Sequence, residues 1–305
     1  MKVLVTGGAG FIGSHIADAC VAAGYEVVVI DDLSSGKRHQ VPPQASFHEV
    51  DIRAPEIAAI LAAERPEVLI HHAAQMDVRR SVADPRFDAQ VNIDGFLNLL
   101  EAGRASGLRR VLFASSGGAG YGEQKEFPAT ENHPLAPMSP YGVAKIASEL
   151  YLGSYRAIYG LEWVALRYAN VYGPRQDPHG EAGVVAIFAR KLLAGEIPTI
   201  NGDGGQTRDY VFVADLVRAN LALIRSDYCG ALNFGTGIET DVNRLHELLA
   251  EACGQGGVAA NRGPAMPGEQ RRSVISPARA GEVLGWHPEV SLESGIPQTV
   301  DFFRS

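Results

Sequence analysis

The segment TGGAGFIGSH, residues 6–15, decides the fold class of this 305-residue chain. It follows the apolar run KVLVT, residues 2–6, which indicates a buried parallel strand, and it opens a pattern of helical period. Gly7, Gly10 and Gly13 are spaced three apart, and such glycines permit a tight turn and a close approach of the main chain to a pyrophosphate. The N-terminus of the following helix supplies free N–H groups. This context predicts a dinucleotide-binding site.

The rest of the chain continues the alternation of strands and helices. After the first strand and a helix over about 11–23, we expect strands at 26–30, 47–51, 67–73, 110–115 and 162–167, and helices at about 86–105 and 140–159. Such an alternation predicts an α/β protein with a Rossmann-type, doubly wound parallel sheet and helices on both faces.

The composition changes after about residue 170, where glycine and proline become frequent. We expect short helices at about 183–194, 214–226, 241–252 and 277–284. The prediction is an NAD-binding Rossmann domain over 1–170 and a smaller α/β domain for the substrate over 171–305. The strand expected at 209–213 is predicted to return to the first sheet.

Charge and cysteine content limit the classes of partner. The formal net charge of −8 argues against nucleic acid and anionic membrane surfaces. The three cysteines, Cys20, Cys229 and Cys253, are far apart and form no metal-binding pattern, so we expect reduced thiols, no metal and a cytoplasmic location. We expect no signal peptide, and no apolar run reaches the ~18 residues of a membrane-spanning helix.

An acidic residue is expected at the end of the second strand, and Asp31 follows VVVI there. Its carboxylate would accept hydrogen bonds from ribose hydroxyls and repel a 2′-phosphate, which favours NAD over NADP. Lys37 and Arg38 lie near enough to keep NADP as an alternative. Asp51, at the end of the third strand, is placed to meet the adenine edge.

A second glycine-rich stretch, ASSGGAG at 114–120, also ends a strand. The polar, proline-containing segment after it predicts no helix directly behind it, so it presents the hydroxyls of Ser115 and Ser116 and no phosphate site. Further on, Tyr141 and Lys145 are spaced by four, so they share one face of a helix that Pro140 opens.

Tyrosine, lysine and an upstream serine together are typical of a general-base site. A free phenol titrates near pH 10, so its pKa must be lowered by up to ~3 units for it to act as a base at neutral pH. The ammonium group of Lys145 and a positive nicotinamide ring would lower it. Ser116 would bond the reacting oxygen and relay its proton.

On these motifs the chain resembles the extended short-chain dehydrogenase/reductases, and within them the UDP-glucose 4-epimerase (UDP-galactose 4-epimerase) group. The resemblance runs almost from end to end, through DDLSSG, HHAAQMDVRRSVADP, VNIDG, SPYGVAK, LRYANVYGPRQ, GDGGQTRDYVFVADL and NFGTG. It implies a homodimer, with the helices at about 86–105 and 140–159 pairing across a two-fold axis as a four-helix bundle.

The resemblance also assigns roles by position. It makes Ser116, Tyr141 and Lys145 the catalytic residues. The NAD-binding residues that it implies are Gly7, Gly10, Phe11, Ile12, Gly13, Asp31, Asp32, Ser35, Gly36, Asp51, Ile52, Ala73, Ala74, Asn92, Tyr141, Lys145 and Tyr168. The substrate-binding residues that it implies are Ser116, Tyr141, Asn170, Arg208, Glu269 and Ser273, with Asn170 and Arg208 on the nucleotide-sugar diphosphate. We interpret His71 and His72 as structural.

Three positions depart from the family pattern. Met266 stands where a second phosphate-binding basic residue is usual, so Arg262, Arg271 or Arg272 is expected to replace it. Asn201 stands where an aromatic residue often stacks on uracil, and Gly120 where a branched apolar residue is usual. Ser273 occupies the position that walls the pocket beside the C2 substituent of the sugar, and its small size predicts room for an N-acetyl group. The alternative is an ordinary polar strand residue.

The residues after Ser116 bear on the reaction. Related 4,6-dehydratases and decarboxylases carry acidic residues near this point, whereas this chain has Gly117 and Gly118. The prediction is therefore a UDP-hexose 4-epimerase that oxidises C4 transiently and returns the hydride to the opposite face. A UDP-glucuronate 4-epimerase, another NAD(P)-dependent nucleotide-sugar dehydrogenase or reductase, and a non-enzymatic nucleotide sensor remain as alternatives.

Overall fold

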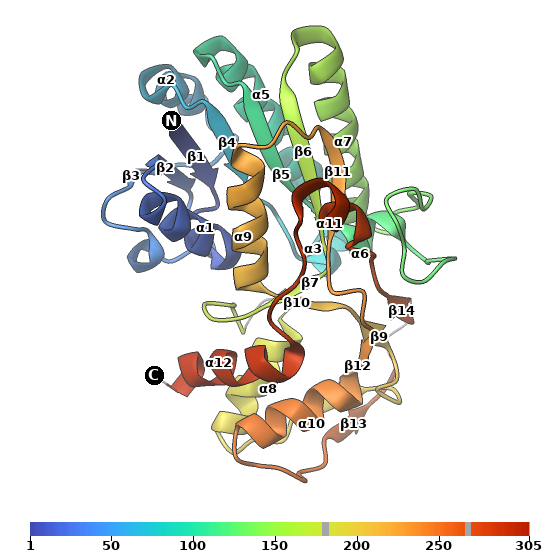
Figure 1. Ribbon diagram of the computed structural model, residues 1–305. Coiled ribbons are helices and arrows are strands. Elements are labelled where there is room, and N and C mark those ends of the chain that lie inside the picture. Colours follow the sequence, from blue (N-terminus) through green and yellow to red (C-terminus); the bar gives the residue numbers. More distant parts are fainter. Residues whose placement is uncertain (179–182, 266–269, 305) are drawn as a thin grey trace. The chain divides into compact units, whose positions relative to one another are not determined.

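The computed structural model describes residues 1–178, 183–265 and 270–304 (Figure 1). The chain forms two compact units, and each is built from separated segments. The first unit comprises Met1–Gly120, Pro137–Arg167 and Val217–Leu232, and the second comprises Tyr121–Ala136, Tyr168–Leu216 and Asn233–Ser305. The units thus interleave along the chain: a later segment does return to the first unit, but it is Val217–Leu232 and not the predicted 209–213, and Tyr121–Ala136 belongs to the second unit.

A seven-stranded sheet organises the first unit. Its strand order is β11-β6-β5-β4-β1-β2-β3. The strands are β1 (Lys2–Thr6), β2 (Glu26–Asp31), β3 (Ser46–Glu49), β4 (Val68–His71), β5 (Arg110–Ser116), β6 (Glu162–Tyr168) and β11 (Gly230–Phe234). β1 pairs in parallel with both β2 and β4, so the strand order reverses at β1. The predicted Rossmann-type sheet is confirmed, and such a reversal places the ligand crevice at the carboxyl ends of the strands.

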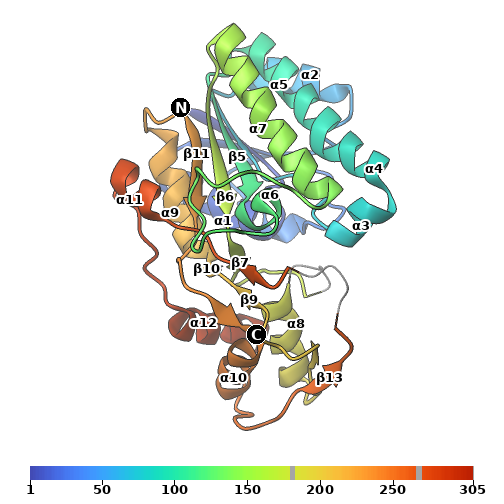
Figure 2. The ribbon, with the colours of Figure 1, turned by 90° about the vertical axis from the view of Figure 1, so that its right-hand side faces the viewer.

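Helices cover both faces of this sheet. α2 (Glu56–Glu64), α5 (Gly95–Ser106) and α7 (Pro140–Tyr159) lie on one face, as Figure 2 shows. α1 (Phe11–Ala22) and residues 217–224 of α9 (Val213–Ile224) cover the other face. The helix predicted at 86–105 consists of α4 (Pro85–Ala89), a π-helical turn (Gln90–Asp94) and α5. Two short helices, η1 (Arg38–Gln40) and α3 (Val78–Ala83), complete this set.

Local sequence explains why the main elements form. The interior of β1 is apolar on both faces, and Val3, Leu4 and Val5 are fully buried, as expected of a central parallel strand. At the start of α7, the Ser139 hydroxyl accepts a hydrogen bond from the N–H of Gly142, and Pro140 occupies the first turn. Gly160 ends the helix with a left-handed φ of 74°.

The second unit has its own apolar core, built mainly from helices. Its helices are α8 (Val184–Leu193), α10 (Val242–Ala252), α11 (Ala278–Leu284) and α12 (Leu292–Arg304). Its strands are β7 (Asn170–Tyr172), β8 (Thr199–Asn201), β9 (Thr207–Arg208), β10 (Tyr210–Phe212), β12 (Thr240–Asp241), β13 (Asn261–Gly263) and β14 (Arg272–Ser273). Phe188, Leu192, Leu245, Leu249 and Val300 belong to its buried core.

Two expectations about this fold were wrong. The strand at 209–213 does not return to the large sheet, because β10 pairs with β7 in a separate two-stranded sheet. β11 occupies the sheet edge beside β6 instead. A short helix, α6 (Gly117–Tyr121), does follow Ser116 directly, because the Ser116 hydroxyl accepts a hydrogen bond from the N–H of Ala119. Within the described ranges, every helix is too short or too polar to cross a bilayer.

Candidate active site

The predicted dinucleotide loop lies at the carboxyl end of β1. Gly7 has a left-handed φ of 69°, and a Cβ built there would lie 2.6 Å from the main-chain N of Ala73. A Cβ on Gly13 would collide with the carbonyl of Gly7. Glycine is therefore required at both positions. The loop leads into the first turn of α1, which begins with Phe11 and Ile12, so its geometry fits a dinucleotide pyrophosphate.

Asp31 is held inside the loops that surround this turn. Its carboxylate accepts hydrogen bonds from the N–H groups of Ala9 and Leu33, each at 2.9 Å. Burial raises the pKa of Asp31, and the two N–H donors oppose that shift. A Cβ on Gly36 would lie 2.8 Å from an Asp31 carboxylate oxygen, so the segment 32–36 packs directly on Asp31. Asp31 thus shapes the loop as well as carrying negative charge.

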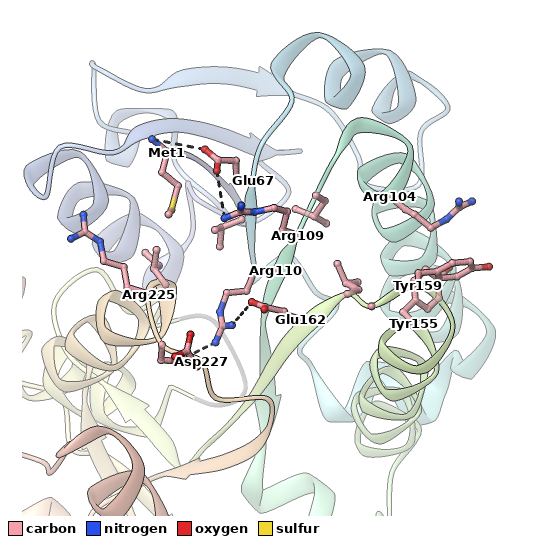
Figure 3. Close-up of a pocket in the computed structure, with 16 residues that line it drawn as sticks. Met1, Glu67, Arg104, Arg109, Arg110, Tyr155, Tyr159, Glu162, Arg225 and Asp227 are labelled. Atoms are coloured by element: carbon pink, nitrogen blue, oxygen red, sulfur yellow. Dashed lines mark hydrogen bonds and ion pairs between the residues drawn. The ribbon is translucent and has the colours of Figure 1, made fainter.

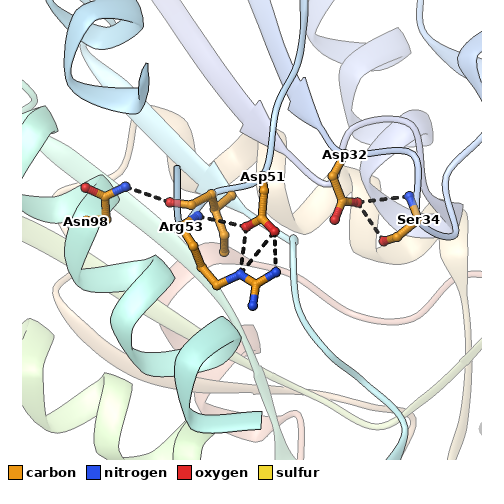
Figure 4. A network of polar contacts seen from close by, with 6 residues as sticks. Asp32, Ser34, Asp51, Arg53 and Asn98 are labelled. Atoms are coloured by element: carbon orange, nitrogen blue, oxygen red, sulfur yellow. Dashed lines mark hydrogen bonds and ion pairs between the residues drawn. The ribbon is translucent and has the colours of Figure 1, made fainter. Parts of the chain in front are cut away.

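Two further acidic residues, Asp32 and Asp51, lie just after the ends of β2 and β3 (Figure 4). Asp32 accepts hydrogen bonds from the main-chain N and the hydroxyl of Ser34. Asp51 forms a bidentate ion pair with Arg53, which holds the pKa of Asp51 below its ordinary value. Arg53 was not among the residues predicted for this site. The main-chain carbonyl of Ile52 accepts a hydrogen bond from Asn98 at 2.8 Å, which joins this loop to α5.

Asn92 takes part in a buried polar network. Its side-chain oxygen accepts a hydrogen bond from the N–H of Gln75, and its amide donates to the carbonyl of Gln75 and to Asp88. Gln75 also donates to Asp88, at 3.0 Å. The network fixes the loop that carries Ala73 and Ala74, so Asn92 shapes this part of the predicted NAD site through the main chain.

The three predicted catalytic residues all lie in the first unit. Ser116 ends β5, while Tyr141 and Lys145 lie one turn apart on α7. A Cβ on Gly142 would lie 2.6 Å from the carbonyl oxygen of Ala119, so the start of α7 packs tightly on the turn after Ser116. At Gly120, the Ile146 side chain lies 2.9 Å from the position of a Cβ, so Ile146 fills the space that a branched residue would need.

Lys145 is buried and only partly compensated. Its ammonium group donates a hydrogen bond to the carbonyl of Ala114 at 2.8 Å, and it lies 4.9 Å from the centre of the Phe113 ring. Burial lowers the pKa of Lys145 to about 8, against a smaller opposing effect of Asp88. Lys145 therefore remains mostly protonated at neutral pH but sits close to its titration point.

Tyr141 is a second group with a shifted pKa. Burial, and after it the negative charge of Asp88, raise the pKa of Tyr141 above its ordinary value. The predicted lowering of this pKa by Lys145 together with a nicotinamide ring stays a prediction; the Lys145 ammonium lies 5.6 Å from the centre of the Tyr141 ring. The same burial lowers the pKa of both His71 and His72, and His71 is held by a 2.7 Å hydrogen bond to Thr6.

Three of the predicted substrate residues come together in the second unit. Ser273 of β14 is the direct strand neighbour of Arg208 in β9, and the main-chain N of Asn170 donates to the carbonyl of Asp209. The guanidinium of Arg208 donates to the carbonyls of Thr207 and Gln270. Glu269 and Met266 lie outside the described residues.

Two further residues belong to the predicted NAD-binding set. Tyr168 is buried and contacts the Phe234 ring edge-on, and Ser35 lies in the loop between Asp32 and Gly36.

The arginines expected to replace a phosphate contact already have protein partners. Arg271 forms a bidentate ion pair with Asp203, and Arg262 donates to the Asp203 carbonyl. Arg272 pairs with Glu239 in the same bidentate way and lies over the Phe127 ring. Asn201 ends β8, where it pairs with Gly263.

Sequence reasoning missed three buried charged residues near the predicted catalytic residues: Asp88, Glu149 and Arg167. Glu149 could have been found, because it lies four residues after Lys145 in the same helical row. Asp88 and Arg167 gave no comparable signal, since each stands alone in an otherwise ordinary helix or strand pattern.

A large hollow lies elsewhere in the first unit, at the amino ends of the strands (Figure 3). It has a volume of about 660 Å³, and its lining includes Met1, Glu67, Arg109, Arg110 and Glu162. The charges pair with one another: Glu67 lies 3.8 Å from Arg109, and Glu162 lies 2.9 Å from Arg110. The described lining contains none of the predicted site residues.

Comparison with known proteins matches the NAD-dependent epimerase/dehydratase family model over residues 3–234. The chain is 47% identical to a UDP-glucose 4-epimerase of Mycolicibacterium smegmatis, covering 100% of this chain and 99% of that one. Two solved structures are similar over 100% of this chain and 99% of theirs. They are a Thermotoga maritima UDP-glucose 4-epimerase with UDP-glucose, at 48% identity and a TM-score of 0.97, and a Thermus thermophilus UDP-glucose 4-epimerase with NAD, at 47% and 0.95.

Proposed function

Since the chain belongs to the NAD-dependent epimerase/dehydratase family, we propose that this enzyme is a 4-epimerase that interconverts UDP-glucose and UDP-galactose. The observation that carries the proposal is the surroundings of Ser116. Gly117 and Gly118 follow it where a dehydratase or decarboxylase would need an acidic group, while Tyr141 and Lys145 are retained on α7. The UDP-glucose 4-epimerases similar to this chain over its whole length support the same substrate.

The chain's own residues would bind the cofactor and move one proton. Gly7, Gly10 and Gly13 would hold the pyrophosphate against the N-terminus of α1. NAD held there would supply a reversible hydride acceptor for C4 of the sugar. Tyr141 would take the proton of the 4-hydroxyl, with Ser116 bonded to the same oxygen. Lys145 would keep a positive charge beside the tyrosine and oppose the effect of burial on its pKa.

The 4-keto sugar must turn over in the pocket before the hydride returns to its other face. The proposal therefore requires that NAD stays bound through a complete cycle, with no net consumption. A reductase on the same fold would consume the reduced cofactor in proportion to product. Incubation with UDP-galactose, UDP-glucuronate and UDP-N-acetylgalactosamine separately, followed by separation of the products, tests the proposed substrate against its alternatives. Product formation only from UDP-glucuronate would overturn it.

We further propose that the enzyme accepts UDP-N-acetylhexosamines. The supporting observation is Ser273, a small buried residue directly beside Arg208 in the sheet of the second unit. Replacing Ser273 with tyrosine should abolish turnover of UDP-N-acetylgalactosamine and spare that of UDP-galactose, because the larger ring would fill the space for the C2 substituent. Ser273→Thr serves as the control of similar size. An unchanged substrate profile in Ser273→Tyr would contradict this assignment.

We also propose that the enzyme is a cytoplasmic homodimer. Val143, Leu150 and Ile158 lie along one side of α7 at helical spacing, and their exposed fractions are 50%, 71% and 66%. Such an exposed apolar row is typical of a helix that packs against another subunit. Light scattering at micromolar concentration should give twice the 32.5 kDa chain mass, and Leu150→Glu should shift it toward the monomer. A monomeric wild type would exclude the dimer.

A further inference from the structure

The helix that carries Tyr141 and Lys145 carries a third functional group in the same row. Tyr141, Lys145 and Glu149 follow one another at intervals of four residues, so their side chains leave the same side of α7. Lys145 reaches β5 at the carbonyl of Ala114, and Glu149 reaches the next residue of that strand, Ser115. Hydrogen bonds therefore connect α7 to two consecutive residues of β5, Ala114 and Ser115, which come immediately before Ser116.

Glu149 is a buried carboxylate with three hydrogen bonds. It accepts one from the Ser115 hydroxyl at 2.5 Å and two from the guanidinium of Arg167, at 3.0 and 2.6 Å. The side chains of both Glu149 and Arg167 are only 6% exposed. A bidentate ion pair of this kind is directional, and its burial leaves neither partner another position to occupy without a large loss of free energy.

The pair connects three elements next to the predicted catalytic residues. Glu149 belongs to α7, Ser115 to the end of β5, and Arg167 to the end of β6. Buried ion pairs add little net stability compared with apolar packing, but they can specify one arrangement of the elements that they join. The arrangement specified here is the position of α7 along β5, which sets the separation of Ser116 and Tyr141.

We propose that Glu149 and Arg167 are positioning residues, whose ion pair, through Ser115, fixes Tyr141 relative to Ser116 for catalysis. The inference rests on the proposed epimerase function only in its choice of substrate. Neither residue needs to touch the sugar or NAD. Loss of the pair should shift the tyrosine by a fraction of an ångström, which is enough to slow proton transfer while substrate binding persists.

The same two strands supply a control for the chemical change, in which the glutamate, Glu162, is 48% exposed instead of buried. Arg110 and Glu162 form an ion pair 2.9 Å apart at the amino ends of β5 and β6, where the side chain of Arg110 is 4% exposed. Glu162→Gln and Glu149→Gln make the same chemical change on an arginine-paired glutamate. Only Glu149→Gln changes a residue that is hydrogen-bonded to Ser115, next to Ser116.

The test compares these variants as purified enzyme with bound NAD. For Glu149→Gln we expect kcat with UDP-galactose to fall about 10- to 100-fold, with KM and NAD content unchanged. Ser115→Ala, which keeps the ion pair and threatens folding less, should lose about 5-fold in kcat. Arg167→Lys should retain more activity than Arg167→Met. Glu162→Gln should match the wild type.

Crystal structures of the wild type and Glu149→Gln separate this proposal from the proposed function. The distance between the Ser116 and Tyr141 hydroxyls should change by roughly 0.5 Å or more. An unchanged distance, or equal kcat in Glu149→Gln, Ser115→Ala and Glu162→Gln, would overturn the positioning role. Failure of the wild type to turn over UDP-galactose would overturn the proposed substrate, and the measured distance would still decide the role of Glu149.

Discussion

The two ends of strands β5 and β6 each hold a buried arginine, and the arginines are used differently. At the amino ends, Arg110 donates to the carbonyls of Leu223 and Tyr228 and to Ser226, and its ion-pair partner Glu162 is 48% exposed. At the carboxyl ends, Arg167 pairs with a carboxylate as buried as itself. Arg110 therefore joins β5 to the end of α9 and the loop after it, whereas Arg167 joins the strands to the helix that carries Tyr141.

The large hollow at the amino ends of the strands does not mark the predicted active site, whose residues lie at the carboxyl ends. The hollow in Figure 3 surrounds Arg110, but its glutamates, Glu67 and Glu162, already pair with Arg109 and Arg110. The carboxyl ends instead gather buried groups whose pKa values have shifted, namely Asp31, Asp88, Tyr141 and Lys145. Buried titratable groups with shifted pKa values, even partly compensated ones, are typical of functional sites, which favours the carboxyl ends of the strands.

The sharpest contrast between the two ends comes from Tyr141→Phe. Removing the hydroxyl should lower kcat by ~10²-fold or more, because the general base is lost, while the fold and NAD content persist. At the amino end, Arg110→Met should leave kcat unchanged and lower the free energy of unfolding by about 2 kcal/mol, since several acceptors lose their donor. Steady-state kinetics and urea unfolding measure both effects. Near-normal turnover in Tyr141→Phe would exclude it as the base.

Lys145→Met separates function from stability at the carboxyl end. Activity should be lost, yet the free energy of unfolding at pH 7 should rise by about 2 kcal/mol, because a buried charge is removed at the cost of one hydrogen bond. Burial lowers the Lys145 pKa from 10.5 to about 8, so the folded state binds fewer protons than the unfolded state between these values. Wild-type stability should therefore rise with pH across this interval.

Urea unfolding of the wild type and Lys145→Met at several pH values checks this sign. The advantage of the variant should shrink as the pH rises from about 8 through 10.5, above which the lysine is mostly neutral in both states. Wild-type kcat should also fall above about pH 8, as the charge beside Tyr141 is lost. A variant less stable than the wild type at pH 7 would show that Lys145 is better compensated than its contacts indicate.

The smallest expected effect is a difference in affinity between NAD and NADP, caused by the charges at the carboxyl ends of the strands. Asp31 and Asp32 place negative charge at the carboxyl end of β2, where Asp51 is already paired with Arg53, so a 2′-phosphate should be repelled there. Calorimetric titration should give NAD a Kd at least about tenfold lower than NADP, or roughly 1.4 kcal/mol. Asp31→Asn should reduce this preference and Glu162→Gln should not. Equal or tighter binding of NADP to the wild type would contradict the role of Asp31.

The sequence alone determined the features that depend on local pattern. Apolar runs and glycine spacing gave the position of β1, the loop at Gly7–Gly13 and the start of α7 at Pro140, and these are correct within a residue or two. A strand buried on both faces must be apolar throughout, and a helix cap must accept a main-chain N–H. Such requirements are met by neighbouring residues, so they can be read from the chain without its partners.

Only the tertiary structure decided features that depend on residues far apart in the chain. The strand at 210–212 pairs with β7 and not with the large sheet. An apolar strand suits either edge in sequence, so the pairing could not be predicted from the chain alone. Ser116 caps a helix that the polar sequence after it concealed. The raised pKa of Tyr141 and the ion pair of Glu149 with Arg167 arise from burial among distant segments. Desolvation and partner choice belong to the packed chain, and no spacing along the sequence encodes them.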